Sequence, residues 1–161
     1  MIIIGIDPGL QGAVAWIVDG VASVFDTPTA EVKKGKKKKT IYLPSEMAGL
    51  LVWAKGRECH VFIEDVHSMP KQGVASSFNF GKGCGIWYGI LAAFQLPYTE
   101  VTPQAWKGML MKGMADKNAA IPRAEQLYPD VELVTARGRK LDGRADALLI
   151  AEYGRRTLEV K

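Results

Sequence analysis

The sequence predicts a single α/β domain built on one mixed β-sheet. Three strand-like segments come first, at about residues 2–7, 12–18 and 21–26, and the short glycine-containing turns between them indicate an antiparallel meander. Helical and strand-like segments then alternate along the rest of the chain, an order typical of a mixed α/β sheet. With 161 residues, the chain can bury roughly two-thirds of its unfolded surface in one domain. We therefore expect one domain over residues 1–161, with three antiparallel strands followed by parallel strands, five in all, and flanking helices.

The first half of the chain carries two strands that end in acids. An almost continuous apolar run at residues 2–6 is typical of a strand covered on both faces, and it ends in Asp7. The segment CHVFIED, at 59–65, predicts a second buried strand, and it also ends in acids. Between them we expect a basic loop at about residues 30–40 and a helix from about Pro44 to Lys55, with the proline in its first turn.

A long helix is expected from about Ala75 to Phe94, and Gly81, Gly85 and Gly89 share one of its faces. Glycine costs about 1 kcal/mol relative to alanine inside a helix. Another backbone should therefore approach this face, either within the domain or across a dimer. The remaining elements expected are a strand at 96–101, a short helix from Pro103 capped by Thr102, a helix over about 116–128 and a terminal helix over DGRADALLIAEYGRR.

Positive charge is concentrated in two clusters. The formal net charge is +4 and the isoelectric point is about 9.1, values that favour a polyanionic partner. A run of lysines is often only a solvated loop, and phosphate binding is the functional alternative. The first cluster comprises Lys33, Lys34, Lys36, Lys37, Lys38 and Lys39, and the second comprises Arg137, Arg139 and Lys140.

The composition is that of an ordinary globular protein, with 48% apolar and 24% charged residues. The apolar runs are far shorter than the ~20 residues of a membrane span, and the N-terminus lacks the features of a signal peptide. Cys59 and Cys84 have no metal-ligand spacing and are expected to be reduced thiols. We therefore expect a cytoplasmic protein with no membrane partner.

Four acids are candidates for a metal site. Asp7 and Glu64 end strands that can lie side by side, and Asp142 and Asp146, four residues apart, share one face of the last helix. Two carboxylates ~4 Å apart repel by on the order of 4 kcal/mol at an effective dielectric of 20, so such a set persists only around cations. Oxygen ligands select Mg²⁺ or Mn²⁺, and two such ions are the known device for phosphodiester hydrolysis. Asp142 has an alternative role as the N-cap of the last helix.

Five segments spread along the chain carry a family resemblance: IIIGIDPGLQGAVAW, VFIEDV, FNFGKGCGIWYGIL, VTPQAWKGML and KLDGRADALLIAEYG. Together, and in this order, they resemble the RuvC family of Holliday junction resolvases, above all its short, phage-type members. The resemblance spans most of the chain outside the lysine-rich stretch. It implies an RNase H-like fold, a homodimer, and divalent-metal cleavage of four-way DNA junctions in a bacterial or phage-infected cell.

The resemblance also assigns the acids. Asp7, Glu64 and Asp146 match the metal-binding acids of the family. In its best-known members a fourth ligand stands three residues before the last acid, where this chain has Gly143, and Asp142 stands one residue earlier. The catalytic set implied is therefore the three matched acids, Asp142 and the lysine Lys107.

Lysines and a histidine are assigned to DNA in the same way. Lys107 and Lys117 match lysines that the family places near the scissile phosphate, and His67 stands where an aromatic residue usually stacks on an unpaired base. Trp106 is either a core residue or such a stacking platform. The DNA-binding residues we expect are His67, Lys112, Lys117 and the two basic clusters.

These observations predict an endonuclease that resolves four-way junctions or other branched DNA by two-metal hydrolysis and leaves 5′-phosphate ends. We expect two Mg²⁺ ions in each site, with Mn²⁺ able to substitute. Two alternatives stay open at this point. One is a protein that binds branched DNA without cleaving it, and the other is an RNase H-like RNA-processing nuclease of the YqgF type.

Overall fold

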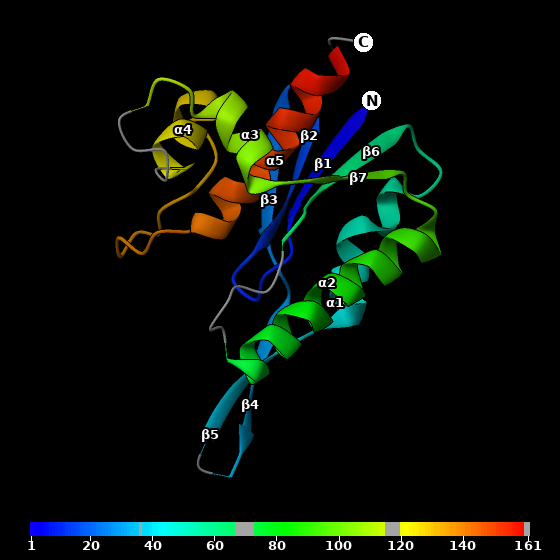
Figure 1. Ribbon diagram of the computed structural model, residues 1–161, viewed down its shortest axis with the longest axis vertical. Helices are drawn as coiled ribbons and strands as arrows, with labels where there is room; N and C mark the ends of the chain where they lie inside the picture. Colours follow the sequence, from blue (N-terminus) through cyan, green and yellow to red (C-terminus); the bar gives the residue numbers. More distant parts are fainter. Residues whose placement is uncertain (36, 67–72, 115–119, 160–161) are drawn as a thin grey trace.

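The computed structural model describes residues 1–35, 37–66, 73–114 and 120–159. Its main sheet has five strands, as expected, and their order is β3-β2-β1-β6-β7 (Figure 1). The pairs β1–β2 and β2–β3 are antiparallel, and the pairs β1–β6 and β6–β7 are parallel. The prediction of one mixed five-stranded sheet is therefore confirmed. The strands are β1 Ile2–Asp7, β2 Ala13–Val18, β3 Val21–Asp26, β6 Cys59–Glu64 and β7 Tyr98–Val101.

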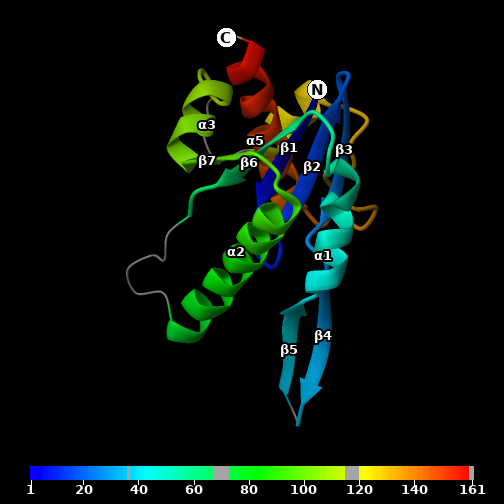
Figure 2. The same cartoon turned by 90° about the vertical axis from the view of Figure 1, so that its right-hand side faces the viewer.

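Helices cover both faces of this sheet (Figures 1 and 2). Ile2, Ile4 and Ile6 of β1 point to the core beneath α1 and α2, whereas Ile3 points to the core beneath α3, α4 and α5. Side chains that alternate in direction along β1 thus contribute to two apolar cores, one on each face of the sheet, as the continuous isoleucine run predicts. The helices are α1 Pro44–Leu51 with a 3-10 turn at Val52–Ala54, α2 Val74–Phe94, α3 Pro103–Leu110, α4 Ala120–Leu127 and α5 Asp142–Glu159. Within the described residues, none of these helices is long and apolar enough to cross a membrane.

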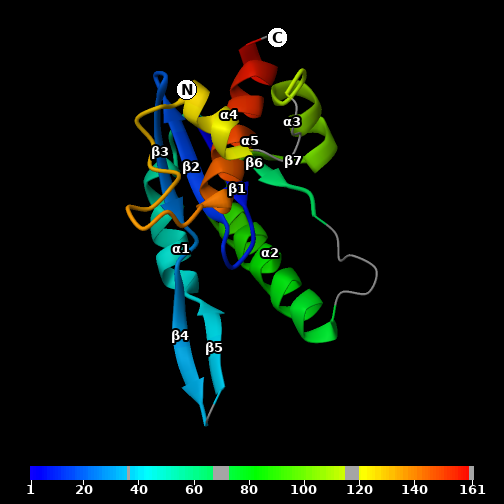
Figure 3. The same ribbon diagram turned by 90° about the vertical axis from the view of Figure 1, so that its left-hand side faces the viewer.

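The expected basic loop at 30–40 is wrong, because this region is a β-hairpin. β4 (Thr29–Lys34) pairs with β5 (Lys37–Tyr42) in a separate two-stranded antiparallel sheet that projects from the body of the domain (Figure 3). β-branched and aromatic residues near the base of both strands favour extended backbone despite the lysines. Gly35, with φ of +64°, supplies the left-handed backbone that the tight turn requires.

Three glycines of α2 were expected to lie against another backbone, and within the described part of the domain they do not. Gly81, Gly85 and Gly89 lie on an exposed face, and a β-carbon on any of them would meet no described atom within 4 Å. The alternative in which another described part of the domain packs against this face is therefore wrong. The alternative in which this face forms a dimer contact stays a prediction. The α2 glycine in close contact is Gly83, where a β-carbon would overlap the Tyr42 ring at the base of the hairpin.

Gly5 sets the distance between the main sheet and α5. It lies in the middle of β1, where α5 crosses, and a β-carbon there would overlap the carbonyl oxygen of Ala147 and stand 2.9 Å from the β-carbon of Ala151. The absence of a side chain lets the two backbones approach directly. Because α5 carries two of the candidate acids and β1 carries a third, this contact also fixes how close those acids come.

Replacing Gly5 by alanine is expected to lower the free energy of unfolding by roughly 1–3 kcal/mol, because the added carbon must push α5 away from β1. Urea denaturation followed by circular dichroism measures the change. Gly49→Ala is the control: this glycine lies inside α1 with no atom within 4 Å, so alanine should be neutral or stabilising by up to ~1 kcal/mol. Equal destabilisation by both substitutions would contradict the role given to Gly5.

Candidate active site

Two acids lie side by side at one edge of the main sheet, at the carboxyl ends of β1 and β6. These strands are parallel and Ile6 pairs with Ile63, so the next residue of each, Asp7 and Glu64, follows in register. The chain turns immediately after β1, and the amide N–H of Gly9 donates to Oδ1 of Asp7 at 3.3 Å. The turn thus holds one oxygen of this carboxylate at the edge of the sheet where β1 ends.

α5 brings the other two acids to the same edge. The helix begins at Asp142 itself, so Leu141 occupies the cap position and the N-cap alternative for Asp142 is wrong. Asp146 follows one turn later, close enough for the charges of Glu64 and Asp142 to raise its pKa. All four predicted acids therefore come from three elements that meet at one sheet edge.

The start of α5 is packed tightly against the loop after β1. A β-carbon on Gly143 would overlap the carbonyl oxygen of Gln11, so a larger residue does not fit at this position. A side chain that could bind metal is therefore excluded at position 143 of this chain. On the other side of the helix, Arg144 forms a two-pronged ion pair with Asp26 at the end of β3, with N–O distances of 2.6 and 3.0 Å.

The electrostatics of the site are those of crowded, poorly hydrated carboxylates. Burial raises the pKa of Asp7 to about 7, with further increases from the charges of Glu64 and Asp146 and an opposing effect of the Gly9 amide. Burial also raises the pKa of Asp146 to about 6. The pKa of Glu64 is raised by burial as well, although a hydrogen bond from Trp106 and the charge of Lys107 oppose this.

A buried acid elsewhere in α5 shows the opposite behaviour. The Glu152 carboxylate accepts hydrogen bonds from the Tyr128 hydroxyl at 2.6 Å and from Arg155 and Arg156 at 2.6 to 2.9 Å. Burial alone would raise its pKa, but these donors outweigh burial and lower it to about 2. Glu152 is thus neutralised by its own neighbours, whereas the acids at the sheet edge are not.

Trp106 is a core residue that also touches the site. It is fully buried in α3, and its indole Nε1–H donates to Oε1 of Glu64 at 2.9 Å. One oxygen of Glu64 is therefore fixed by the protein. From the sequence, Trp106 could be a core residue or a DNA contact, and its bond to Glu64 was not predicted. The available signal is that a buried indole N–H usually finds a hydrogen-bond partner.

Lys107 lies close to the acids. Its ammonium group stands 5.0 Å from the centre of the Trp106 ring, in a cation–π arrangement. Its charge lowers the pKa of both Glu64 and Asp146. Lys107 is thus the positive group, among the described residues, whose field acts on two of the acids.

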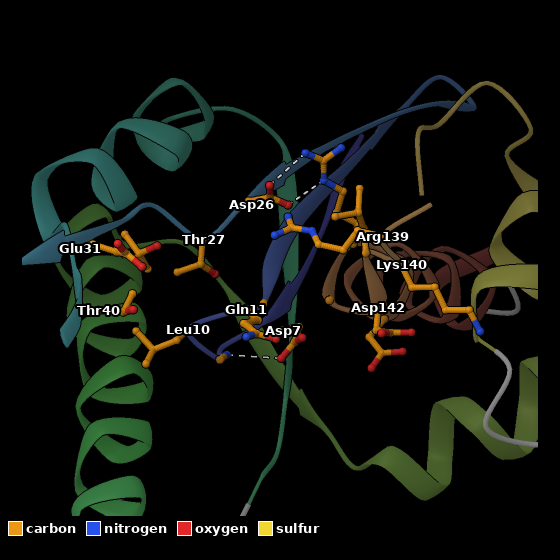
Figure 4. Close-up of a pocket in the computed structure, with 17 residues that line it drawn as sticks. Asp7, Leu10, Gln11, Asp26, Thr27, Glu31, Thr40, Arg139, Lys140 and Asp142 are labelled. Carbon is orange, nitrogen blue, oxygen red and sulfur yellow. Dashed lines mark hydrogen bonds and ion pairs between the residues drawn. The ribbon is translucent and has the colours of Figure 1, made fainter. Parts of the chain in front are cut away.

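Three of the four acids, Asp7, Asp142 and Asp146, line a cavity of about 740 Å³, and Glu64 lies behind this lining. In Figure 4, Asp7 and Gln11 lie in the middle, Glu31 and Thr40 of the hairpin lie on one side, and Asp142 and Lys140 lie on the other. Asp146 and Arg139 also line the cavity. The cavity is thus acidic in its interior and carries positive side chains on one wall.

Solved structures share this architecture. The structure of T. thermophilus RuvC in complex with a Holliday junction substrate matches with a TM-score of 0.58 and 14% identity, over 99% of this chain and 96% of that chain. A second Thermus thermophilus RuvC structure matches with a TM-score of 0.54 and 16% identity, over 98% and 96% of the two chains. The fold is that of RuvC. At these identities the likeness establishes the fold alone; no protein-family model matches the sequence, and no curated protein matches it significantly.

The RuvC fold raises the question of whether the acids could hold divalent metal. In the described part of the chain, no three Asp, Glu, His or Cys side chains stand together in an arrangement ready to bind a metal ion. The chemistry of the donor set nevertheless fits a hard cation, because it consists of carboxylate oxygens whose pKa values are raised first by burial and then by the charges of neighbouring acids. Asp7, Glu64 and Asp146 would hold such an ion, with Asp142 beside them.

The predicted DNA-binding residues are spread over the RuvC fold. Arg139 and Lys140 line the acid cavity, whereas Arg137 and Lys112 are exposed outside its lining. His67, Lys117 and Lys36 lie outside the described residues. The other lysines of the first cluster, Lys33, Lys34, Lys37, Lys38 and Lys39, belong to the β4–β5 hairpin.

Without metal, the protein is expected to become less stable as the pH rises from about 4 to 7. Folded Asp7 keeps its proton up to pH about 7, whereas the unfolded chain releases it near pH 3.8, so the folded state binds more protons in this window. Asp7→Asn should remove much of this dependence of stability on pH. It should also raise the free energy of unfolding at pH 7.5 by ~2–4 kcal/mol. Urea titrations in EDTA at pH 5 and pH 7.5 measure both effects.

The control for this prediction is Asp19→Asn, which makes the same charge change in an exposed turn at the opposite end of β2. It should leave the pH slope unchanged. Added Mg²⁺ should stabilise the wild-type protein more at pH 7.5 than at pH 5. If the free energy of unfolding of Asp7→Asn depends on pH as steeply as that of the wild type, the raised pKa of Asp7 is not the cause of the pH dependence.

A pair of tryptophan substitutions isolates the bond to Glu64. Trp106 and Trp87 are both fully buried, but the indole N–H of Trp87 has no partner among the described residues. Trp106→Phe should therefore cost about 1.5–3 kcal/mol more stability than Trp87→Phe, because only the first breaks a hydrogen bond to a charged group. The comparison is made by urea unfolding at pH 7.5, and equal losses would argue against the bond.

Proposed function

We propose that the protein is a divalent-metal-dependent endonuclease that cleaves branched DNA, with the four-way junction as its main substrate. The observation that carries this proposal is the meeting of Asp7, Glu64 and Asp146 at one sheet edge of a RuvC fold. The T. thermophilus RuvC structure that shares the fold contains a Holliday junction substrate. The net charge of +4, with Arg139 and Lys140 in the cavity wall, suits a polyanion.

The roles proposed for the side chains follow from their positions. We propose that Asp7, Glu64 and Asp146 would hold divalent metal, two ions per site, with Asp142 completing the ligands. Mg²⁺ or Mn²⁺ held there would supply an activated water and stabilise charge on the phosphate. Trp106 holds one oxygen of Glu64 by a hydrogen bond, which restricts the orientation of this carboxylate as a metal ligand.

The positive groups position and neutralise the substrate. Lys107, whose field already reaches Glu64 and Asp146, balances charge at the scissile phosphate. Arg139 and Lys140 contact neighbouring phosphates from the cavity wall. Hydrolysis in this arrangement is proposed to leave 5′-phosphate and 3′-hydroxyl ends.

We also propose that the protein acts as a homodimer. A four-way junction has near two-fold symmetry, so two sites related by a two-fold axis can cut opposite strands. The exposed glycine face of α2 continues into Phe78, which is 72% exposed, and an exposed aromatic beside open backbone suits a subunit contact. Analytical ultracentrifugation of the free protein measures the oligomeric state.

Asp7→Asn is expected to reduce cleavage of a four-way junction roughly a thousandfold or more, because one metal ligand and several kcal/mol of transition-state stabilisation are lost. Binding of the junction in EDTA should be retained, since the basic surfaces are unchanged. Labelled four-way junction, linear duplex and RNA–DNA hybrid are incubated with Mg²⁺, Mn²⁺ or EDTA, with Asp19→Asn as the charge-matched control.

Paired nicks across the junction that require metal and Asp7 are the expected result. Full activity of Asp7→Asn would exclude this acid from the site. Cleavage of the RNA hybrid alone would replace the proposed function by RNA processing, and metal-independent binding without cleavage would leave a branched-DNA-binding protein.

A further inference from the structure

The β4–β5 hairpin is anchored firmly in the domain at its base. Tyr42, the last residue of β5, is buried in the core between the sheet and α2, beside Gly83. The N–H of Thr27 donates to the Gly12 carbonyl at 2.9 Å, and the N–H of Leu43 donates to the Pro28 carbonyl at 3.0 Å. These contacts fix the direction in which the hairpin leaves the domain (Figures 1 and 2).

The register of the hairpin sorts its residues onto two faces. In an antiparallel pair, directly opposed residues share a face and successive residues alternate. Glu31 opposes Thr40 and Lys33 opposes Lys38, so these two pairs lie on one face, which we call the cavity face. The opposite face carries Lys39, opposed to Val32, and Lys37.

The cavity face is continuous with the acid site. Thr29, Glu31 and Thr40 line the same cavity as Asp7 and Asp142 (Figure 4). Lys33 and Lys38 form the next pair outward on this face, about 7 Å beyond Glu31 and Thr40 at the rise of a strand. A chain that enters the acid cavity and leaves over the hairpin therefore meets these two lysines.

The charges on this face suit phosphate. Lys38 forms an ion pair of 2.9 Å with Glu31, but both side chains are about two-thirds exposed, so the pair contributes little stability and is readily exchanged. Arg139 and Lys140 line the facing wall. A DNA strand whose phosphate reaches the acids would thus have cations on both sides of its path, whereas an acidic protein has no reason to extend into a cluster of carboxylates.

We propose that the cavity face of the β4–β5 hairpin, through Lys33 and Lys38, binds the phosphates of the DNA strand that leaves the acid cavity, and that the opposite face does not touch DNA. This inference rests on the proposed nuclease function. It makes the hairpin a one-sided guide for the substrate rather than a general source of positive charge.

The test compares two double variants that remove the same charge from the same strands. Lys33→Gln/Lys38→Gln changes the cavity face, and Lys37→Gln/Lys39→Gln changes the opposite face. Affinity for a labelled four-way junction is measured by fluorescence anisotropy in EDTA, from 50 to 200 mM salt, after circular dichroism has shown that both variants are folded. Cleavage at saturating junction is measured separately with Mg²⁺.

The cavity-face variant should bind roughly 5- to 20-fold more weakly at 100 mM salt, and its plot of log affinity against log salt should be shallower by about 2, one phosphate contact for each lysine. The opposite-face variant should stay within about 3-fold of wild type, as expected for a loss of general attraction only. A fall in the cleavage rate at saturating junction that exceeds the fall in affinity would contradict a role of these lysines confined to binding.

Glu31→Gln provides an independent check, because it removes a carboxylate from the proposed path and frees Lys38. It should tighten junction binding by about 2- to 3-fold, consistent with the loss of one rim charge. Weaker binding by this variant would contradict the proposal that the DNA strand runs over the cavity face of the hairpin.

Equal weakening by the two double variants, or no weakening by either, would overturn the one-sided hairpin while leaving the nuclease function intact. Failure of the wild-type protein to bind or cut branched DNA would instead overturn the proposed function, and this inference with it. The two failures are therefore distinguishable in one set of measurements.

Discussion

The contact between β1 and α5 is the constraint on which the site depends. At Gly5 and Gly143 the chain has no side chain to keep the helix away from β1 and from the loop that follows it. The helix therefore lies directly on the strand, and its first two turns reach the edge where β1 and β6 end. The ion pair of Arg144 with Asp26 holds the start of the helix from the other side. The position of every candidate acid follows from this one close approach and from the parallel pairing of β1 with β6.

This arrangement has an electrostatic cost that the structure does not offset by itself. Glu152, on the same helix, shows what the fold does with an acid that serves stability alone: it surrounds the carboxylate with a hydroxyl and two guanidinium groups, and its pKa falls. At the sheet edge the pKa values of Asp7 and Asp146 rise instead. A cluster kept in this state is typical of a functional site. Stability and function thus place opposite demands on two acids only six residues apart in α5, Asp146 and Glu152.

Much of the main sheet could be predicted from the sequence, because its signals are local. The isoleucine run and the segment CHVFIED identify the two central strands, and parallel pairing then places Asp7 beside Glu64. The hairpin was missed because the run of lysines was interpreted by its charge alone. The same segment contains β-branched residues that favour strands: Thr29, Val32, Thr40 and Ile41.

Other features could not be read from local sequence at all. The bond of Trp106 to Glu64 joins residues 42 positions apart and depends on how α3 meets β6. Spacing alone singled out three glycines of α2, yet the glycine that permits a close contact is Gly83, because only that position faces Tyr42. The small space beside Gly143 is likewise defined by the carbonyl of Gln11, on a distant loop. In each case the decisive partner comes from another part of the chain.

The separate hydrogen-bonding of the hairpin has a mechanical consequence. β4 and β5 pair with each other in a sheet of their own, and among the described strands no ladder of hydrogen bonds runs from them into the five main strands. A load applied to the tip can bend or twist this ribbon without shearing the register of β1 against β6. The hairpin is therefore a compliant element attached to a stiff one, so its tip can change direction while the spacing of the acids at the sheet edge stays constant.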